Sequence, residues 1–425
     1  MMSNISQEIE KEMIALGNAA KTGFSELFGC NGEKRNSALK AAAAAIRSNA
    51  HKIIEANESD MESANNRGLS SAMIDRLMLD NDRVEAMAVG LDSISELPDP
   101  VGKILAAWDR PNGLKIERVS VPLGVIGIIY ESRPNVTADA AALCLKSGNS
   151  VILRGGSESF ESNHAIFECM REGLKSVDVS ENVIQFIGTR DREAVGFLLS
   201  HMAEYVDVIV PRGGKSLIKR VQDDARVPVI GHLEGICHVY LHSSADLSVA
   251  RNVVLNAKMR RTGICGAAET ILVDKDAATK LLPKVSKDLL DAGCEIRGDE
   301  GTKSIVSEAI SANEDDWYTE YLDAIISIRI VENIDDAIAH IGKYSSGHTE
   351  SIIASDKDAA EKFLHSVDSA IVLHNASTQF ADGGEFGMGA EIGIATGRVH
   401  TRGPVGAEQL TSYKYVVRGT GQTRP

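Results

Sequence analysis

The sequence predicts an α/β protein built on a doubly wound parallel sheet, followed by a second α/β region. Three observations carry this prediction. The first hundred residues show helical patterns only, short apolar runs alternate with helices from residue 114 onward, and two of these runs end in paired glycines. Strands buried on both faces of a parallel sheet are continuous apolar runs joined by helices. At about 150 residues per domain, 425 residues correspond to two or three domains.

The N-terminal region is helical by its spacing. Apolar residues such as Ile9, Met13 and Leu16 recur at helical intervals, and an Ala-rich helical segment follows at 38–46. The pattern predicts no strand before Leu114.

The central region alternates β-branched runs with helical patterns. The expected strands are 125–130, 150–154, 183–186, 206–210, 227–230 and 238–241. The expected helices between them are 136–146, 163–175, 192–201 and 215–222.

A second α/β region follows the first. Its expected strands are 270–273, 324–330, 351–354 and 370–373, and its expected helices are 277–290, 303–310, 334–341 and 357–365. The tail from Gly383 is rich in glycine and ends in a strand-like run at 413–418. A strand placed after the body of the fold often pairs with another subunit.

The charge balance excludes some classes of function. The chain has 45 basic and 60 acidic residues, a net charge of −15. An acidic surface repels phosphate backbones and anionic headgroups, so we expect no nucleic-acid partner and no membrane. An anionic ligand has to be held by basic groups gathered locally against that field.

The N-terminal residues lack the basic start and apolar run of an export signal. The most apolar stretch, 121–130, is much shorter than the roughly 20 residues that span a bilayer. We therefore expect a cytoplasmic protein with free thiols, because its six cysteines are scattered and form no CxxC pair. They are Cys30, Cys144, Cys169, Cys237, Cys265 and Cys294.

The same Arg-Gly-Gly pattern follows two of the expected strands. The strand at 150–154 ends in Arg154-Gly155-Gly156, and the strand at 206–210 leads into Arg212-Gly213-Gly214. Glycines that open a helix let backbone N–H groups approach a phosphate, and the arginine and the helix terminus add positive potential. The pair predicts a nucleotide cofactor across the carboxyl ends of neighbouring strands, the alternative being two ordinary turns. No G-x-G-x-x-G fingerprint is present.

Cys265 is the candidate nucleophile. It lies in Thr262-Gly-Ile-Cys265-Gly-Ala-Ala-Glu269, where small neighbours leave room for a substrate carbonyl. Lys258 and two arginines just upstream favour a thiolate. The alternative is a small buried hydrophobic residue, as most free cysteines are.

Two other clusters contain side chains that could bind a metal or an anion. His238 and His242 share one face of a strand beside Cys237, but zinc sites need tighter geometry, so we expect no metal. Arg398, His400 and Arg402 alternate in a Gly-rich run. In an extended segment they share one side, where they could gather a carboxylate or phosphate or form a solvated basic edge.

With these features in view, the chain resembles the aldehyde dehydrogenase superfamily and, within it, the gamma-glutamyl phosphate reductase (glutamate-5-semialdehyde dehydrogenase) family. The resemblance covers nearly the whole chain, and five segments in the family's order carry it. They are 121–139, 206–218, 227–240, 255–273 and 375–406.

The resemblance implies three parts. Residues 1–107 and 123–231 would form a doubly wound NADP-binding domain, and residues 232–395 an α/β catalytic domain with Cys265. Residues 108–122 and 403–425 would form a small β flap that joins subunits into a homodimer or homotetramer.

The resemblance also implies a reaction. NADPH would reduce L-glutamyl 5-phosphate to L-glutamate 5-semialdehyde and phosphate through a Cys265 thioester, the second step of proline biosynthesis from glutamate. Functional association with a glutamate 5-kinase would follow. The alternatives are an oxidative or CoA-acylating aldehyde dehydrogenase, and a catalytically silent oligomeric scaffold.

Site roles follow from the same resemblance. Arg154 stands where the superfamily has lysine, and Ser157 replaces the usual carboxylate, which favours a 2′-phosphate. The other cofactor residues implied are Gly155, Gly156, Gly188, Thr189, Arg212, Gly213, Gly214 and Glu320. The substrate residues implied are Arg133, His232, Arg398, His400 and Arg402.

Two roles differ from the superfamily pattern. The asparagine that forms the oxyanion hole in the superfamily aligns near Ser132 of this chain. The resemblance therefore implies that Asn135 or the Cys265 backbone N–H takes that role. The superfamily's glutamate general base falls at His232, and Glu234 lies two residues further on.

Overall fold

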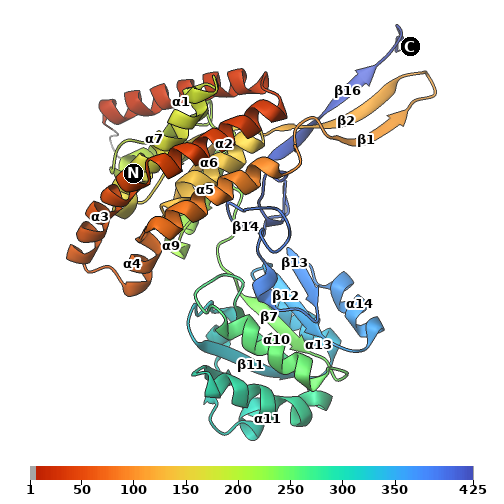
Figure 1. Cartoon of the computed structure of the whole chain (residues 1–425). Coiled ribbons are helices and arrows are strands. Elements are labelled where there is room, and N and C mark those ends of the chain that lie inside the picture. The colour runs from red at the N-terminus through yellow and green to blue at the C-terminus, as the bar shows by residue number, and fades with distance from the viewer. Residues whose placement is uncertain (1–5, 425) are drawn as a thin grey trace. The chain divides into compact units, whose positions relative to one another are not determined.

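The structure, a computed structural model, describes residues 6–424 and contains two compact units (Figure 1). Unit 1 consists of Met1–Gly231, Gly387–Gly393 and Val405–Pro425, and unit 2 of His232–Phe386 and Ile394–Pro404.

Unit 1 contains a parallel sheet of four strands in the order β5-β4-β3-β6. The chain leaves β3, pairs β4 and β5 on one side, and then places β6 on the other side of β3. This change of direction defines the doubly wound topology, which the sequence pattern predicted. The strands are β3 (Val125–Tyr130), β4 (Ser150–Arg154), β5 (Ile184–Phe186) and β6 (Val208–Arg212).

Four helices follow these strands. They are α6 (Asn135–Lys146), α7 (Phe160–Ser176), α8 (Arg192–His201) and α9 (Lys215–Asp224). Every residue of β3 and β4 is buried, because helices cover both faces of the sheet. The strand expected at 227–230 forms only an isolated bridge between Ile209 and Val229, so that prediction is wrong.

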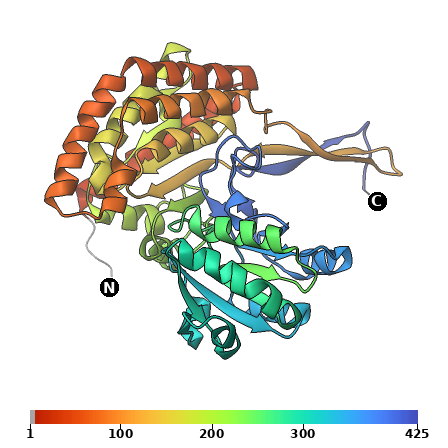
Figure 2. The ribbon, with the colours of Figure 1, turned by 60° about the horizontal axis from the view of Figure 1, so that its bottom comes forward.

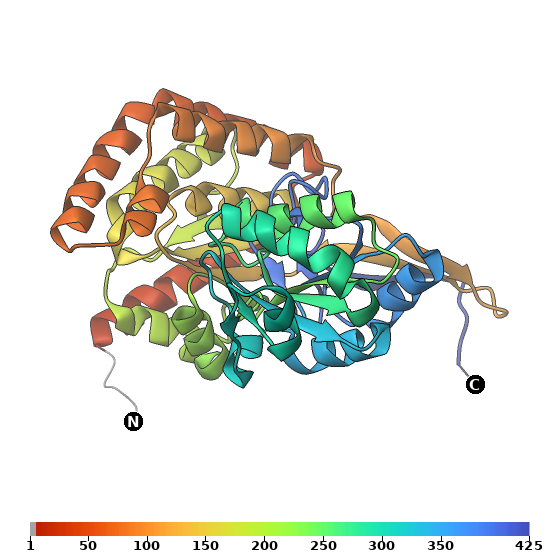
Figure 3. The same cartoon turned by 90° about the horizontal axis from the view of Figure 1, so that it is seen from below.

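The N-terminal region of unit 1 is helical, as its spacing predicted. Side-chain oxygens of Ser6, Asn31, Ser70 and Asp80 cap the first turns of four of its helices. The helices are α1 (Gln7–Phe28), α2 (Gly32–Ser48), α3 (Ala50–Asn66), α4 (Ser71–Leu77) and α5 (Asn81–Glu96). Helix α1 packs with α8 against one face of the sheet, whereas α2 and α3 pack against α7 (Figure 3).

A separate antiparallel sheet of unit 1 joins β1 (Ile104–Asp109), β2 (Lys115–Pro122) and β16 (Thr411–Arg418) in the order β1-β2-β16. It extends away from the helices of that unit (Figure 2). The C-terminal strand is confirmed, but β1 contradicts the prediction of no strand before Leu114. Its Ala-Ala centre carries little β-propensity, and pairing with β2 determines its conformation.

Unit 2 has one parallel sheet of seven strands, in the order β10-β9-β11-β8-β7-β12-β13. Adjacent strands pair in parallel throughout. The strands are β7 (Cys237–Leu241), β8 (Ala268–Asp274), β9 (Glu295–Gly298), β10 (Ile310–Ser311), β11 (Ile325–Val331), β12 (Thr349–Ile353) and β13 (Ile371–His374).

Helices cover both faces of this second sheet. One apolar core packs α10 (Leu247–Met259) and α11 (Lys275–Asp291) against it. Another core packs α13 (Ile334–Tyr344) and α14 (Lys357–Ser366). The helix expected at 303–310 is wrong in its second half, because α12 (Glu300–Ile305) ends early and Ile310 pairs with β9.

The remaining elements are short. They are the 3₁₀ turns η1 (Ser157–Ser159), η2 (Glu181–Val183), η3 (Glu314–Tyr318) and η4 (Thr378–Phe380), and the strand pair β14 (Ile394–Ala395) and β15 (Gly403–Pro404). Within residues 6–424 no helix combines the length and apolarity needed to cross a bilayer.

Candidate functional site

Cys265 lies in the loop between α10 and β8 and is half-buried. Cys30 is also half-buried, whereas the other four cysteines are buried. The loop packs closely on Gly235, where a Cβ atom would lie 2.1 Å from the Cys265 carbonyl oxygen and 2.6 Å from its Cα. Only glycine fits there, so Gly235 lets the two segments meet.

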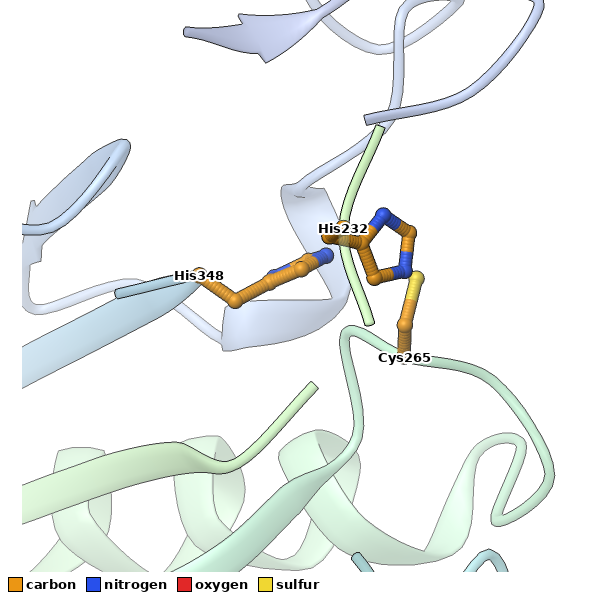
Figure 4. Close-up of side chains that lie close together, drawn as sticks. All are labelled: His232, Cys265 and His348. Atoms are coloured by element: carbon orange, nitrogen blue, oxygen red, sulfur yellow. The ribbon is translucent and has the colours of Figure 1, made fainter. Parts of the chain in front are cut away.

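Two histidines flank the Cys265 sulfur (Figure 4). Sγ of Cys265 and one ring nitrogen each of His232 and His348 lie within 4.8 Å of one another. The two rings meet edge to face, with their centroids 4.9 Å apart. His232 precedes β7, and His348 directly precedes β12, the strand that pairs with β7. The sheet therefore brings together residues separated by long stretches of sequence.

Hydrogen bonds fix which nitrogen of each ring faces the sulfur. His232 Nδ1 donates to the Ile394 carbonyl oxygen at 2.6 Å, which leaves Nε2 as the basic nitrogen beside Sγ (Figure 4). His348 Nδ1 lies 2.8 Å from the Thr349 hydroxyl oxygen. Its Nε2 is buried and has no hydrogen-bond partner among the described protein atoms.

The two imidazoles favour the thiolate. Burial by itself would raise the pKa of the Cys265 thiol, but the charge of His348 and the hydrogen bond to His232 outweigh it. The pKa is held well below its ordinary value. His232 Nε2 is placed to take the thiol proton, which gives a thiolate beside an imidazolium. Such a sulfur can attack an electrophilic carbonyl carbon.

Cys237 is a poor competitor for this role. Its Sγ donates to the Cys265 carbonyl oxygen at 3.1 Å, so it is held as a thiol. Burial raises its pKa well above the ordinary value. His238, next in the chain, is buried against Glu350 with Nδ1 and Oε2 2.9 Å apart, and it does not join the Cys265 cluster.

Glu320 also belongs to this part of unit 2. Its Oε1 accepts the Gly235 N–H at 2.9 Å. Burial raises the pKa of Glu320, and the negative charge at Cys265 raises it further. Its carboxylate therefore lies within electrostatic reach of the sulfur.

Apart from Glu320, which belongs to unit 2, the residues expected to bind a nucleotide lie at one edge of the unit 1 sheet. Arg154–Ser157 follow β4, Gly188-Thr189 follow β5, and Arg212–Gly214 end β6 and open α9. Because these strands are parallel, all of their carboxyl ends lie at the same edge. Arg154 is 8% exposed, and its buried Nε has no hydrogen-bond partner within residues 6–424. An orphaned guanidinium N–H there fits an anionic ligand group.

Two carboxylates, those of Glu158 and Glu131, lie beside Gly156 and Gly213 in these turns. Glu158 Oε1 accepts the N–H and hydroxyl of Ser132, both at 2.7 Å. Glu131 Oε2 accepts the Gly214 N–H at 2.8 Å, at the start of α9. A Cβ atom at Gly213 would lie 2.5 Å from Glu131 Oε2. This glycine thus admits a side chain of the protein itself, and a phosphate at the same N–H has to displace Glu131.

Arg133 and Asn135 lie between β3 and the first turn of α6 in unit 1. Asn135 Nδ2 donates to the Asp139 carboxylate at 2.8 Å. Burial raises the pKa of Asp139 to about 6, although that hydrogen bond opposes it. The side-chain amide of Asn135 is therefore held by Asp139, one helical turn further along α6.

Arg398 and Arg402 both pair with Asp368. The segment between them is not an extended strand, because His400 has a φ of 73°. The expectation of three side chains on one face of an extended run is therefore wrong. The two arginines do gather a carboxylate, but it is one from the protein itself.

His348 carries no sequence signal for a place beside Cys265. It lies 83 residues after Cys265 in Ser345-Ser-Gly-His348-Thr, a run with no motif spacing to Cys265. Only the sheet topology could have indicated it. Strands β12 and β8 both pair with β7 in parallel, so His348 at the start of β12 lies near the Cys265 loop at the start of β8. His232, expected at the substrate side, lies at the sulfur.

The model of the aldehyde dehydrogenase family matches residues 1–323. The gamma-glutamyl phosphate reductases of Rhodospirillum rubrum and Hyphomonas neptunium are each 58% identical to this chain over 420 residues, 99% of this chain and 98% of each relative. The crystal structure of the Thermotoga maritima gamma-glutamyl phosphate reductase matches with a TM-score of 0.95 at 45% identity, over 97% of this chain and 100% of that chain. An engineered glycolyl-CoA reductase with bound NADP⁺ shares the fold, with a TM-score of 0.67 at 17% identity over 95% of this chain and 96% of that chain.

Proposed function

Because the chain belongs to the aldehyde dehydrogenase family, we propose that it uses NADPH to reduce L-glutamyl 5-phosphate to L-glutamate 5-semialdehyde and phosphate. This is the second step of proline biosynthesis from glutamate. One observation carries the proposal: a half-buried cysteine whose pKa is lowered by two imidazoles. The full-length similarity to reductases named for that substrate supports the choice of acyl group.

The chemistry follows from the sulfur. The Cys265 thiolate attacks the acyl carbon of the acyl phosphate, and the carbon–oxygen bond to phosphate breaks, which gives a thioester and inorganic phosphate. A hydride added to the thioester carbonyl gives a thiohemiacetal, which collapses to aldehyde and regenerates the thiolate. NADPH, when bound, supplies that hydride. Either Asn135 or the Cys265 backbone N–H would bind the oxyanion.

Unit 1 supplies the cofactor site in this proposal. Arg154 would bind the 2′-phosphate, since its Nε is buried and unpartnered, and Ser157 adds no repelling carboxylate. The turns at Gly155-Gly156, Gly188-Thr189 and Arg212–Gly214 would line the pyrophosphate at the carboxyl edge of the sheet. Glu320 would bind the nicotinamide ribose. Arg133, His232, Arg398, His400 and Arg402 would contact the substrate.

His232 in place of a glutamate base suits a reductase. A thioester awaiting hydride has to survive contact with water, and a well-placed carboxylate base would speed its hydrolysis by roughly 10²–10⁴-fold. His232 Nδ1 is held by the Ile394 carbonyl, and its Nε2 faces the sulfur. It is therefore engaged with the nucleophile.

The wider organisation is part of the same proposal. Residues 1–107 and 123–231 would form the cofactor domain, 232–395 the catalytic domain, and 108–122 with 403–425 the flap of a homodimer or homotetramer. The enzyme would be cytoplasmic. It would also associate functionally with a glutamate 5-kinase, because its acyl phosphate substrate is labile.

The test is the reverse reaction on purified protein. We expect L-glutamate 5-semialdehyde to reduce NADP⁺ rapidly only when phosphate or arsenate is present, and Cys265→Ala to abolish this at every phosphate concentration. Rapid turnover to glutamate without phosphate would indicate an ordinary aldehyde dehydrogenase. A requirement for coenzyme A in place of phosphate would indicate a CoA-acylating enzyme. Cys30→Ser, at the other half-buried cysteine, should leave the rate unchanged.

A further inference from the structure

The three side chains at the proposed nucleophile also have the composition of a metal site. Thiolate sulfur and imidazole nitrogen are the ligands that Zn²⁺ prefers in proteins. Among residues 6–424, His232, Cys265 and His348 are the one set of three such groups whose ligand atoms lie within 4.8 Å of one another. We propose that this cluster binds a zinc-class divalent cation, which occupies the nucleophile and reversibly inhibits the enzyme.

The spacing is within reach of a coordinated state. Zinc lies about 2.3 Å from sulfur and 2.0–2.1 Å from nitrogen in a tetrahedron, which places the ligand atoms roughly 3.3–3.6 Å apart. The three ligand atoms now lie within 4.8 Å of one another, so they have to approach by about 1 Å to coordinate one zinc ion. Three protein ligands leave the fourth position open to water, as in catalytic rather than structural zinc sites.

The hydrogen bonds outside the cluster orient both rings for a cation. Metal-bound histidines usually anchor the nitrogen that is not coordinated. His232 Nδ1 is anchored by the Ile394 carbonyl oxygen and His348 Nδ1 lies against the Thr349 hydroxyl, so each ring turns its Nε2 toward the sulfur (Figure 4). His348 is fully buried, and among residues 6–424 its Nε2 has no partner in standard hydrogen-bond geometry. A buried nitrogen that faces a thiolate can be satisfied by a proton or by a cation held between the two atoms (Figure 4).

The electrostatics agree with this geometry. Metal binding requires deprotonated cysteine and neutral histidine. The metal therefore has to displace the one proton that Cys265 and His232 share, whichever of the two atoms holds it. Glu320 adds a carboxylate within electrostatic reach of Cys265. Cys237 is excluded as the sulfur ligand, because it donates its proton to the Cys265 carbonyl.

Binding by itself does not depend on the reaction, but inhibition rests on the proposed function. A sulfur that shares its lone pair with a cation attacks carbonyl carbon slowly, and His232 is occupied at the same time. Zn²⁺ bound there should therefore block both acylation of Cys265 and its alkylation by iodoacetamide. A chelator should restore both.

The test uses the full chain, reduced with a phosphine and freed of metals. Titration with Co²⁺ should give one equivalent with a thiolate-to-cobalt charge-transfer band that Zn²⁺ displaces. Cys265→Ser should remove the band, and His348→Gln should weaken Co²⁺ binding roughly 10–100-fold or more. His365→Gln, at an exposed histidine on α14, is the matched control and should change neither.

Alkylation provides a second measurement that does not rely on the folding of a variant. In the wild-type protein Zn²⁺ should protect Cys265, but not Cys30, from iodoacetamide. A missing band, a band unchanged in Cys265→Ser or His348→Gln, or unprotected Cys265 would overturn the metal site. If zinc binds and protects Cys265 while the phosphate-dependent reaction is absent, the proposed function fails and the metal site stands.

Discussion

The Cys265 sulfur differs from the other thiols in its neighbours more than in its exposure. Cys265 and Cys30 are both half-buried, but only Cys265 has two imidazoles beside it. Cys237 lies close by, yet it is buried and donates a hydrogen bond. Reactivity toward a soft electrophile follows the thiolate fraction and access to the sulfur.

A limited dose of iodoacetamide at pH 7 should therefore modify Cys265 first. We expect a rate about tenfold or more above that of Cys30, and no modification of Cys237 in the folded protein. Peptide mass spectrometry of a time course measures all three sites in one sample. Equal rates at Cys265 and Cys30 would show that the histidines do not activate the sulfur.

The turn after β4 should select the cofactor. Arg154 has a buried, unpartnered Nε there, and Ser157 stands at the start of η1. A carboxylate at position 157 would repel a 2′-phosphate and accept hydrogen bonds from a free ribose instead. We expect Ser157→Glu to raise the KM for NADPH by at least about tenfold, equivalent to about 1.4 kcal/mol, with a much smaller effect on NADH. Ser157→Ala is the matched control. Equal use of both cofactors by the wild-type enzyme would contradict the role assigned to this turn.

At the scale of elements, a buried ion pair joins α10 to β8 on either side of the Cys265 loop. Lys258 Nζ lies 2.5 Å from Glu269 Oε2, and both side chains are fully buried. Removal of one partner leaves an uncompensated charge in the core, which costs about 3–5 kcal/mol. Replacement of both partners with apolar residues avoids that cost.

We therefore expect Lys258→Met to lower the midpoint of thermal unfolding sharply and Lys258→Met/Glu269→Leu to recover most of the loss. The exposed pair Lys287–Asp291 on α11 is the control, since truncating it should cost under about 1 kcal/mol. Differential scanning calorimetry of the wild type, Lys258→Met, Glu269→Leu, the double variant and Lys287→Ala measures the coupling. A double variant less stable than Lys258→Met would show that the pair itself stabilises the loop.

The elements that the sequence predicted best are those whose pattern is local. Buried runs such as β3 and amphipathic helices such as α8 (Arg192–His201) show their burial pattern within a few residues. Strand β1 does not, because its six residues are mostly exposed and it depends on β2 for its conformation. The site residues also differ in how far the sequence predicts them. The small residues around Cys265 are a local signal, whereas His348 reaches the site only because β12 pairs with β7.

At the scale of the whole molecule, the sheet β1-β2-β16 exposes apolar side chains that the rest of its unit does not cover. Tyr413, Tyr415 and Val417 alternate along β16 and are each about half exposed, so they share one face. Trp108 joins them, with its ring 6.2 Å from that of Tyr415. Exposed apolar patches of this kind on a sheet with free edges mark surfaces that bind another chain.

We expect this sheet to join subunits, and the double substitution Tyr415→Lys/Val417→Lys to shift the protein toward monomer. Two lysines on each copy would place like charges across the interface and remove two apolar anchors, while the antiparallel pairing of β16 with β2 depends only on the backbone. Light scattering coupled to size-exclusion chromatography measures the mass at several concentrations. Val399→Lys, at the exposed Val399 of unit 2, should leave the oligomer intact. A wild-type protein that is monomeric at micromolar concentration, or a double variant with unchanged mass, would show that the assembly uses another surface.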